Sequence, residues 1–346
     1  MAFSSRAGAL VLALAALAAG ARAAERLPAL GAAADRVTVS GISSGGYMAV
    51  QFHVAHSARV DGAGVLAGGP YLCAGGSAFT AYYNCMRPGS WTPLPEVRTL
   101  GAATEALAAA GRIDPVAGLA RSRVWLFSGT RDDTVRPVVV DALAAYYRQF
   151  VPAAAVARVA DRPAGHAMVT ENAGAACGVT APPFINACDF DAAGVLLAHL
   201  VGPLAAPVAD GGRLVAFDQR EFTGGDAYAA SLDDTGWLFV PAACERERCR
   251  VHVAYHGCRQ GREAVGEAYV NGAGYNRWAA ANRLVVLYPQ AIARYGWGVG
   301  RSGWSYAFNP NGCWDWWGYT GAGYATRDGA QIRAVRAMLD RLAAPR

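Results

Sequence analysis

Short apolar runs separated by turn residues are the dominant pattern along this chain. Seven of them are rich in Val, Leu, Phe, Trp or Tyr and are bounded by Gly, Pro or charged residues. They occupy residues 37–40, 124–127, 154–159, 214–218, 237–240, 251–255 and 284–288. Continuous runs of this length predict strands that are buried on both faces of a sheet.

Stretches with a helical pattern lie between these runs. Residues 45–56, 191–201 and 331–342 are compatible with helices, and apolar side chains recur every three to four positions in the last of them. Strands that alternate with helices predict the α/β class, with a mostly parallel sheet covered by helices on both faces. Residues 203–212 are rich in Pro, Ala and Gly and predict a surface connection between the two halves.

The N-terminal segment has the features of an export signal. Arg6 provides a positive charge, residues 7–20 are apolar, and Ala21-Arg22-Ala23 fits the rule for a cleavage site. The apolar run is short for a membrane span, so a retained anchor is the less favoured alternative. We therefore expect residues 1–23 to be a signal peptide and residues 24–346 to form one catalytic domain of a periplasmic or extracellular protein. No later stretch predicts a membrane span.

The composition narrows the possible chemistry. Hydrophobic residues make up 53% of the chain and charged residues only 16%, as in a packed globular protein. The net charge of +5 comes from arginines that form no run or stripe, which argues against a nucleic-acid partner. The chain contains no lysine, and this excludes Schiff-base chemistry, a P-loop lysine and a Ser-Lys dyad.

Eight cysteines in an exported chain predict disulfides. Proximity in sequence favours three local pairs and leaves one long-range pair, although sequence alone leaves other pairings open. The favoured pairs are Cys73 with Cys85, Cys177 with Cys188, Cys244 with Cys249, and Cys258 with Cys313. A zinc site is the alternative, but the chain has no CxxC motif, so we expect neither a metal nor another cofactor.

The segment Gly41-Ile42-Ser43-Ser44-Gly45 lies between a predicted strand and a predicted helix. A G-x-S-x-G sequence in that context is typical of a nucleophile elbow, where glycines permit the tight turn and the helix N-terminus faces the reaction centre. In a glycine-rich chain the motif alone is weak evidence, and its context is stronger. We predict Ser43 as the nucleophile, since Ile42 occupies the position where Ser44 would need a glycine.

A carboxylate and a histidine follow in the order that α/β-hydrolases require. Asp132 and Asp133 come just after the strand predicted at 124–127; we favour Asp132 and regard Asp133 as the alternative or as a turn residue. His166 lies in a loop of small residues after the run at 154–159. It would act as the general base, with the aspartate fixing its tautomer. The histidines expected to have packing or surface roles are His53, His56, His199 and His252.

The position of Ser43 predicts a circular permutation. An ordinary α/β-hydrolase has several strands before its elbow, whereas here only about 20 residues follow the predicted cleavage site. The second half contains a strand at 251–255 that runs into His256-Gly257-Cys258, a sequence type that forms oxyanion holes. We therefore predict that the second half precedes the elbow in space. The backbone N–H groups of Ser44 and Cys258 would form the oxyanion hole, and His256 would shape the loop.

Together these segments resemble the poly(3-hydroxybutyrate) depolymerase family, in particular its single-domain, circularly permuted type. The resemblance spans the chain after the signal peptide and rests on five segments in matching order: GISSGGYMAVQ, GTRDDTV, AGHAM, YHGC and NPNGCWDWWGY. It implies the same triad and oxyanion hole, and a polyester polymer or oligomer as substrate. The alternatives are a feruloyl- or acetylxylan-type carboxylesterase and a binding protein without catalytic activity.

Tryptophans gather near Cys313. Trp314, Trp316 and Trp317 are candidate substrate-binding residues, because a Cys258–Cys313 bond would hold them beside the oxyanion loop. Aromatic faces suit an apolar polyester, although a place in the core is an equally good interpretation for Trp316. Nothing nearby suggests an arginine that would bind a charged substrate.

Overall fold

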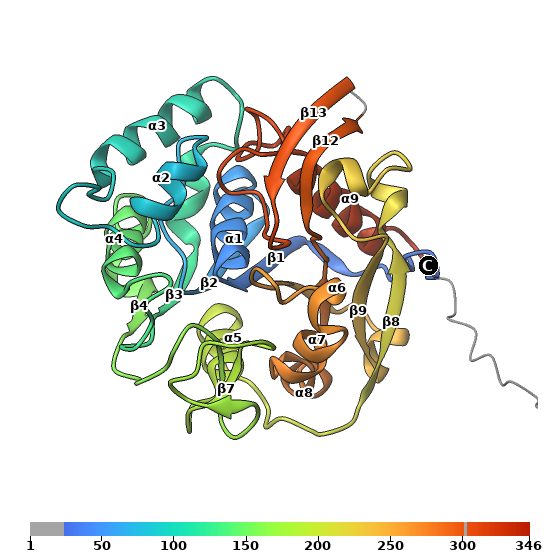
Figure 1. The fold of residues 1–346 in the computed structure, drawn as a ribbon. Helices are drawn as coiled ribbons and strands as arrows, with labels where there is room; N and C mark the ends of the chain where they lie inside the picture. The colour runs from blue at the N-terminus through green and yellow to red at the C-terminus, as the bar shows by residue number, and fades with distance from the viewer. Residues whose placement is uncertain (1–23, 301–302) are drawn as a thin grey trace, which may run out of the picture.

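The computed structural model describes residues 24–300 and 303–346, so the expected signal peptide lies outside the described residues. An eight-stranded sheet runs through the molecule in the order β4-β3-β2-β1-β10-β11-β9-β8 (Figure 1). Its strands are β1 (Ala33–Ile42), β2 (Val60–Leu66), β3 (Arg123–Phe127), β4 (Val156–Val159), β8 (Gly212–Asp218), β9 (Thr235–Pro241), β10 (Arg250–Tyr255) and β11 (Leu284–Tyr288).

Six neighbouring strands of this sheet, from β4 to β11, are parallel. In the middle, Val39 of β1 pairs with Ala63 of β2 on one side and Val253 of β10 on the other. β9 runs antiparallel to both β11 and β8, so an antiparallel hairpin completes one edge. All seven predicted strands are present, and the prediction of a mostly parallel α/β sheet is confirmed.

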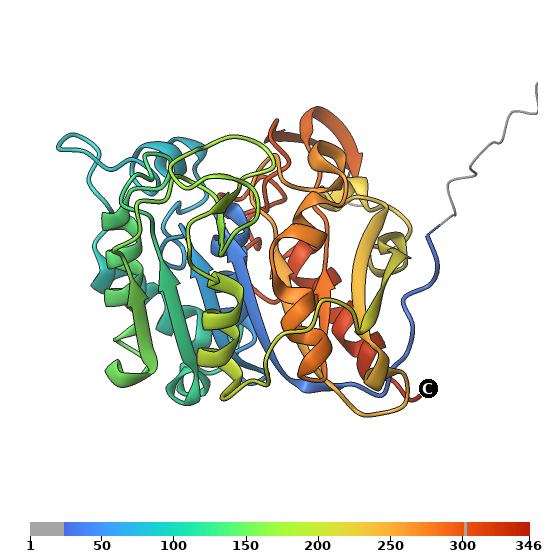
Figure 2. The same cartoon turned by 90° about the horizontal axis from the view of Figure 1, so that it is seen from below.

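Helices cover both faces of the sheet (Figures 1 and 2). One layer contains α1 (Ser44–Ala55), α3 (Val97–Ala109), α4 (Pro137–Tyr147) and α9 (Ala330–Ala343). The opposite layer contains α5 (Ala192–Val201), α7 (Ala268–Gly272) and α8 (Tyr275–Ala281). Because both faces are buried, the strands are continuously apolar: in β11, Val285 packs on the first face and Val286 on the second.

The remaining elements lie in the connections. Short helices α2 (Ala78–Tyr83) and α6 (Arg262–Val265) follow β2 and β10 in sequence. A small sheet has the order β5-β7-β6 and contains β5 (Met168–Thr170), β6 (Ala175–Ala176) and β7 (Ile185–Ala187). A hairpin of β12 (Arg294–Gly300) and β13 (Gly303–Asn309) extends beyond the central sheet (Figure 1). These elements were not predicted from the sequence.

The path of the chain explains the early position of β1. From β8, the chain passes through β9, β10, β11 and α9, and this half of the sheet lies directly beside β1. The end of α9 also meets the segment that leads into β1: the Gly31 N–H donates to the Ala344 carbonyl at 2.9 Å, and the Ala32 N–H donates to the Leu342 carbonyl at 2.9 Å. Joining these two segments would restore strands before the elbow, as the predicted circular permutation requires.

All four predicted disulfides are present, namely Cys73–Cys85, Cys177–Cys188, Cys244–Cys249 and Cys258–Cys313. Within the two described ranges, no helix is both long and apolar enough for a bilayer crossing. The predicted connection at 203–212 is irregular up to residue 211, and Gly212 already belongs to β8.

Candidate active site

Ser43 occupies a sharp turn between β1 and α1. Its φ is +57°, a left-handed conformation that is costly for a residue with a side chain, and such strain is typical of a nucleophile elbow. A Cβ at Gly41 would collide with the Gly45 carbonyl, and one at Gly45 would collide with the Tyr255 and His256 carbonyls. Both glycines of the motif are therefore required because other backbone atoms approach them closely, and they do not merely reflect the high glycine content of the chain.

Asp132 and His166 form a buried pair. Asp132 follows β3, and its Oδ2 lies 2.8 Å from Nδ1 of His166. Its Oδ1 accepts hydrogen bonds of 2.9 Å from the N–H groups of Thr134 and Val135, which fix the carboxylate. With Nδ1 of His166 facing the aspartate, Nε2 is the ring nitrogen left for proton transfer. Asp133 is exposed and its side chain takes no part in this pair.

The other histidines have structural surroundings. His53 bonds Tyr147 and Ser122, and His252 bonds Thr38 and Ser40, all inside the core. Burial lowers the pKa of both imidazoles to about 3, so both stay neutral near neutral pH. His252 thus fixes β1, which leads into the elbow, and His53 fixes α1, which follows it.

The two N–H groups predicted to form the oxyanion hole belong to Ser44, at the start of α1, and to Cys258, which lines the cavity. The first hydrogen bond of α1 joins the Tyr47 N–H to the Ser43 carbonyl at 3.0 Å, so the Ser44 N–H lies in the first turn without an acceptor in the helix. In the loop after β10, the N–H groups of Gly257 and Arg259 bond Gln260 and Asn311. Among the described residues, none accepts a hydrogen bond from the Cys258 N–H between them.

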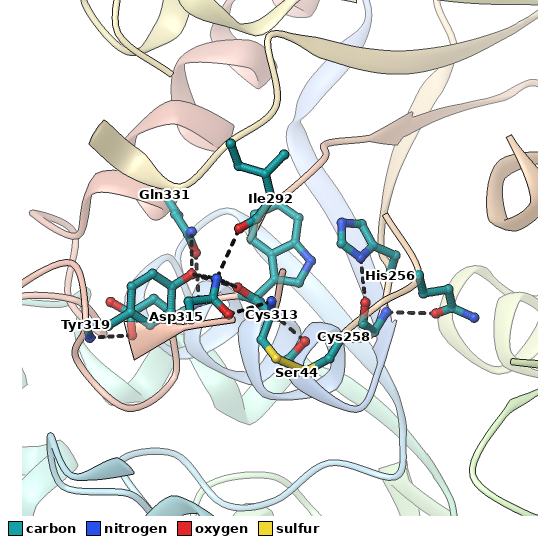
Figure 3. The surroundings of a disulfide bond; sticks show 12 residues. Ser44, His256, Cys258, Ile292, Cys313, Asp315, Tyr319 and Gln331 are labelled. Carbon is teal, nitrogen blue, oxygen red and sulfur yellow. Dashed lines mark hydrogen bonds between the residues drawn. A yellow bond between two sulfur atoms is a disulfide. The ribbon is translucent and has the colours of Figure 1, made fainter. Parts of the chain in front are cut away.

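His256 holds this loop in shape. Its Nε2 accepts a 3.0 Å hydrogen bond from the Ala291 N–H, which leaves the proton on Nδ1 for the Gly257 carbonyl at 2.7 Å (Figure 3). Burial lowers the pKa of the His256 imidazole to about 4, in keeping with a neutral ring. Both ring nitrogens are engaged in the loop, which agrees with a shaping role rather than that of a second base.

The disulfide Cys258–Cys313 joins the loop to the tryptophan-rich segment (Figure 3). Asn309 bonds both backbone groups of Cys313, with its Oδ1 accepting from the N–H at 2.8 Å and its Nδ2 donating to the carbonyl at 2.9 Å. Further along, Asp315 accepts backbone hydrogen bonds from residues 317–320. Burial raises the pKa of the Asp315 carboxyl. The segment opposite the elbow is thus fixed at several points.

Ser43 and His166 open into a largely apolar cavity of about 350 Å³. Trp316 and Trp317 line it, and Trp316 stacks on Tyr47 with ring centroids 3.8 Å apart. Trp314 does not line the cavity: its side chain is fully buried and packs edge-on against Tyr255. The expectation that all three tryptophans contact substrate is therefore wrong for Trp314, because this irregular segment turns its side chain into the core against Tyr255.

Comparison with known proteins gives a consistent result. No protein-family model matches the chain. A poly(3-hydroxybutyrate) depolymerase of Delftia acidovorans is 45% identical over 327 residues, which cover 92% of this chain and 62% of that protein. A polyhydroxybutyrate depolymerase of Talaromyces funiculosus is 36% identical over 334 residues, which cover 93% of this chain and 94% of that protein. The chain belongs to the polyhydroxybutyrate (PHB) depolymerase family.

Solved structures of PHB depolymerases have the same fold. The crystal structure of the enzyme from Penicillium funiculosum superposes with a TM-score of 0.81 at 35% identity and covers 92% of this chain and 98% of that chain. A PHB depolymerase with a serine-to-alanine substitution, complexed with an R3HB trimer, superposes with a TM-score of 0.82 at 34% identity and the same coverage. The resemblance inferred from the five sequence segments is confirmed.

Several cavity residues of this PHB depolymerase relative escaped the sequence analysis. Thr180 lines the cavity and its Oγ1 accepts the His166 N–H at 2.9 Å; Phe184 and Phe308 also line it. Arg259 lines it too, so the expectation that no arginine is close is wrong. The local sequence around these residues does not indicate a role in binding, since only the packing of loops brings them together at the cavity. The position of Arg259 directly after Cys258 was the one available clue.

Proposed function

We propose that this protein hydrolyses ester bonds of poly(3-hydroxybutyrate) or its oligomers through an acyl-enzyme on Ser43. The observation that carries the proposal is the buried Asp132–His166 pair, which opens together with Ser43 into an apolar cavity. Membership of the PHB depolymerase family and the R3HB trimer in a related structure support the choice of substrate.

In the first half of the reaction, Ser43 Oγ attacks the ester carbonyl carbon while His166 Nε2 takes the hydroxyl proton. The negative charge on the carbonyl oxygen would be stabilised by the N–H groups of Ser44 and Cys258. Collapse of this intermediate breaks the bond to the alkoxide, which receives the proton from His166. The acyl group remains on Ser43, and Asp132 stabilises the imidazolium throughout.

In the second half, water attacks the acyl-enzyme with His166 as the base. The tetrahedral intermediate uses the same two N–H groups, and its collapse releases a carboxylic acid and restores the Ser43 hydroxyl. The chain's own residues thus account for every proton transfer in the cycle, and the hydrolysis consumes only water.

The surface next to the cavity supports a polymeric substrate. The hairpin β12–β13 exposes Trp297 and Trp304, whose side chains are 71% and 74% accessible, and Phe308 continues this aromatic face into the cavity. A polyester presents methyl and ester groups without charge, which aromatic faces suit. We infer that the hairpin contacts the polymer.

We also infer that the protein works outside the cytoplasm. Its eight cysteines form four disulfides, which persist in oxidising compartments. The signal-like segment at 1–23 supports the same inference.

Incubation with amorphous poly(3-hydroxybutyrate) and with its trimer tests the proposal. We expect 3-hydroxybutyrate and short oligomers as products, identified by mass spectrometry, and a loss of at least about a thousandfold in kcat for Ser43→Ala. Release of ferulate or acetate from matched esters, with no attack on the polyester, would favour the carboxylesterase alternative. Undiminished hydrolysis by Ser43→Ala would contradict the assignment of the nucleophile.

A further inference from the structure

Arg259 brings an uncompensated positive charge to the cavity of Ser43 and His166. The described lining contains no Asp or Glu, and Arg259 has no ion-pair partner among the described residues. Glu263 lines an adjoining hollow together with Arg259. Its carboxylate accepts the Ala293 N–H at 3.1 Å and makes no ion pair with the arginine. Arg259 is exposed to solvent at the edge of the cavity, so its charge remains accessible to a ligand that enters.

The backbone of Arg259 is held in an unusual conformation. Its φ is +55°, a left-handed value that glycine adopts at lower cost than arginine. The Arg259 N–H donates to the Asn311 carbonyl at 2.7 Å, so the root of the side chain is fixed. Strained positions of this kind concentrate at ligand sites, where the surrounding structure maintains them.

The guanidinium is also placed by its neighbours. It lies 5.3 Å from the ring centroid of Phe184, a cation–π contact. Gln260 donates to the carbonyls of Pro183 and Phe184 at 3.0 Å each, which ties the segment carrying the ring to the loop carrying Arg259. The backbone of Arg259 and the Phe184 ring beneath its guanidinium are therefore both held in place, while the charged end reaches solvent.

We propose that Arg259 binds the free carboxylate at the acid end of a hydroxyacid oligomer, and so favours short oligomers and chain ends over the interior of the polymer. The inference rests on the proposed function. In an oligoester the single carboxylate always stays with the alcohol side of the ester bond that breaks. The carboxylate bound at Arg259 therefore belongs to the fragment that leaves when Ser43 is acylated. Interior polymer segments carry no such charge.

The test compares the trimer of (R)-3-hydroxybutyrate as free acid and as methyl ester. We expect the ratio of kcat/KM for acid over ester to fall about tenfold in Arg259→Gln, as for loss of a charge-assisted hydrogen bond, and to recover partly in Arg259→Lys. Arg148→Gln, which changes an exposed arginine outside the cavity, should keep the wild-type ratio. In the wild type the ratio should fall as NaCl rises from about 20 to about 500 mM.

A binding measurement separates this inference from the proposed function. Calorimetry on Ser43→Ala needs no turnover, and we expect the acid to bind about fivefold to tenfold more tightly than the methyl ester, a difference that Arg259→Gln should abolish. Equal affinities for the two ligands in Ser43→Ala would overturn the role of Arg259, even if the wild type hydrolyses both trimers. If neither trimer is hydrolysed, the proposed function fails, while the calorimetry still decides whether Arg259 binds a carboxylate.

Discussion

Asp132 and Asp133 are neighbours in sequence with opposite surroundings. Asp132 is buried and bonds His166, whereas the side chain of Asp133 is exposed. Sequence reasoning favoured Asp132 without deciding the matter, because a turn places successive side chains in directions that only the folded loop defines. In the folded loop the N–H groups of Thr134 and Val135 bind the carboxylate of Asp132, and this holds Asp132 toward His166.

The two aspartates provide a matched test at this scale. Asp132→Asn should lower kcat by about a thousandfold to ten-thousandfold, because an amide at this position no longer favours the productive tautomer or stabilises the imidazolium. Asp133→Asn should stay within about twofold of the wild type, since an exposed change away from the site has little effect. Hydrolysis of a p-nitrophenyl ester gives both values. Comparable losses in the two variants would contradict the assignment.

Residues with a distinctive motif could be predicted, and residues placed by packing could not. Ser43, His166 and Cys258 stand in recognisable sequence contexts. Phe184 and Arg259 reach the cavity through a contact between two loops that are 75 positions apart in sequence. Trp314 was misassigned because alternating aromatics do not reveal which members of the set are buried.

At the scale of elements, β2 was missed because its sequence contains glycines where a strand usually has branched side chains. A Cβ at Gly64 would collide with Leu196 of α5, and one at Gly62 would collide with the Arg123 carbonyl of β3. The glycines therefore permit a helix and a neighbouring strand to approach closely. The β12–β13 hairpin was missed for a related reason, since glycines interrupt β12 at Gly296, Gly298 and Gly300.

The disulfide beside the oxyanion loop should matter for catalysis as well as for stability. In Cys258→Ala/Cys313→Ala the loop loses its tether, and we expect kcat for a soluble ester to fall about tenfold or more, because oxyanion N–H groups act only when well placed. Cys244→Ala/Cys249→Ala removes a disulfide between β9 and β10 that lies outside the cavity lining. It should lower Tm with little change in kcat. Equal kcat in both double variants would argue against a role for the tether.

The aromatic hairpin should matter for the polymer and not for small esters. Trp297→Ala/Trp304→Ala should reduce binding to amorphous polymer particles by about tenfold through lost apolar contact, and leave p-nitrophenyl ester hydrolysis within about twofold. Trp91→Ala is the control, because Trp91 is 98% exposed and lies in a different loop. Depletion of protein from solution by the particles measures binding. Equal binding by the wild type, Trp297→Ala/Trp304→Ala and Trp91→Ala would contradict the role of the hairpin.

On the scale of the whole molecule, the sequence predicted the sheet, its helical layers and the permutation. The alternation of apolar runs with helices indicated a mostly parallel sheet, and the short segment before Ser43 indicated the unusual chain order. The order of strands was not predictable, because it depends on pairings such as Val286 with Phe239 between distant segments. Continuously apolar strands offer no polar pattern that would specify a neighbour.

Buried neutral histidines should make the fold sensitive to acid. Burial lowers the pKa of His53 and His252 to about 3 and that of His56 and His256 to about 4, against about 6.5 in an unfolded chain. The stabilisation is complete above pH 6.5 and declines as pH falls toward these values, because only the unfolded state gains protons there. Each histidine changes the free energy of unfolding by about 1.4 kcal/mol per pH unit at most.

Urea unfolding at pH 7.5, 6 and 5 measures this effect, and most carboxylates stay ionised in both states over that range. We expect the free energy of unfolding to decrease steadily from the first value to the last. A free energy that is constant over this range would rule out the four histidines as its source.

The distribution of the site along the chain also determines when it can exist during synthesis. Ser43, Asp132 and His166 leave the ribosome well before Cys258 and its tether Cys313. A protein shortened by a premature stop before residue 258 would contain the proposed nucleophile and base but lack part of the proposed oxyanion hole. Full-length chains that have not met an oxidising environment would lack the tether. The proposed site is therefore complete only in a molecule that has been synthesised past Cys313 and oxidised.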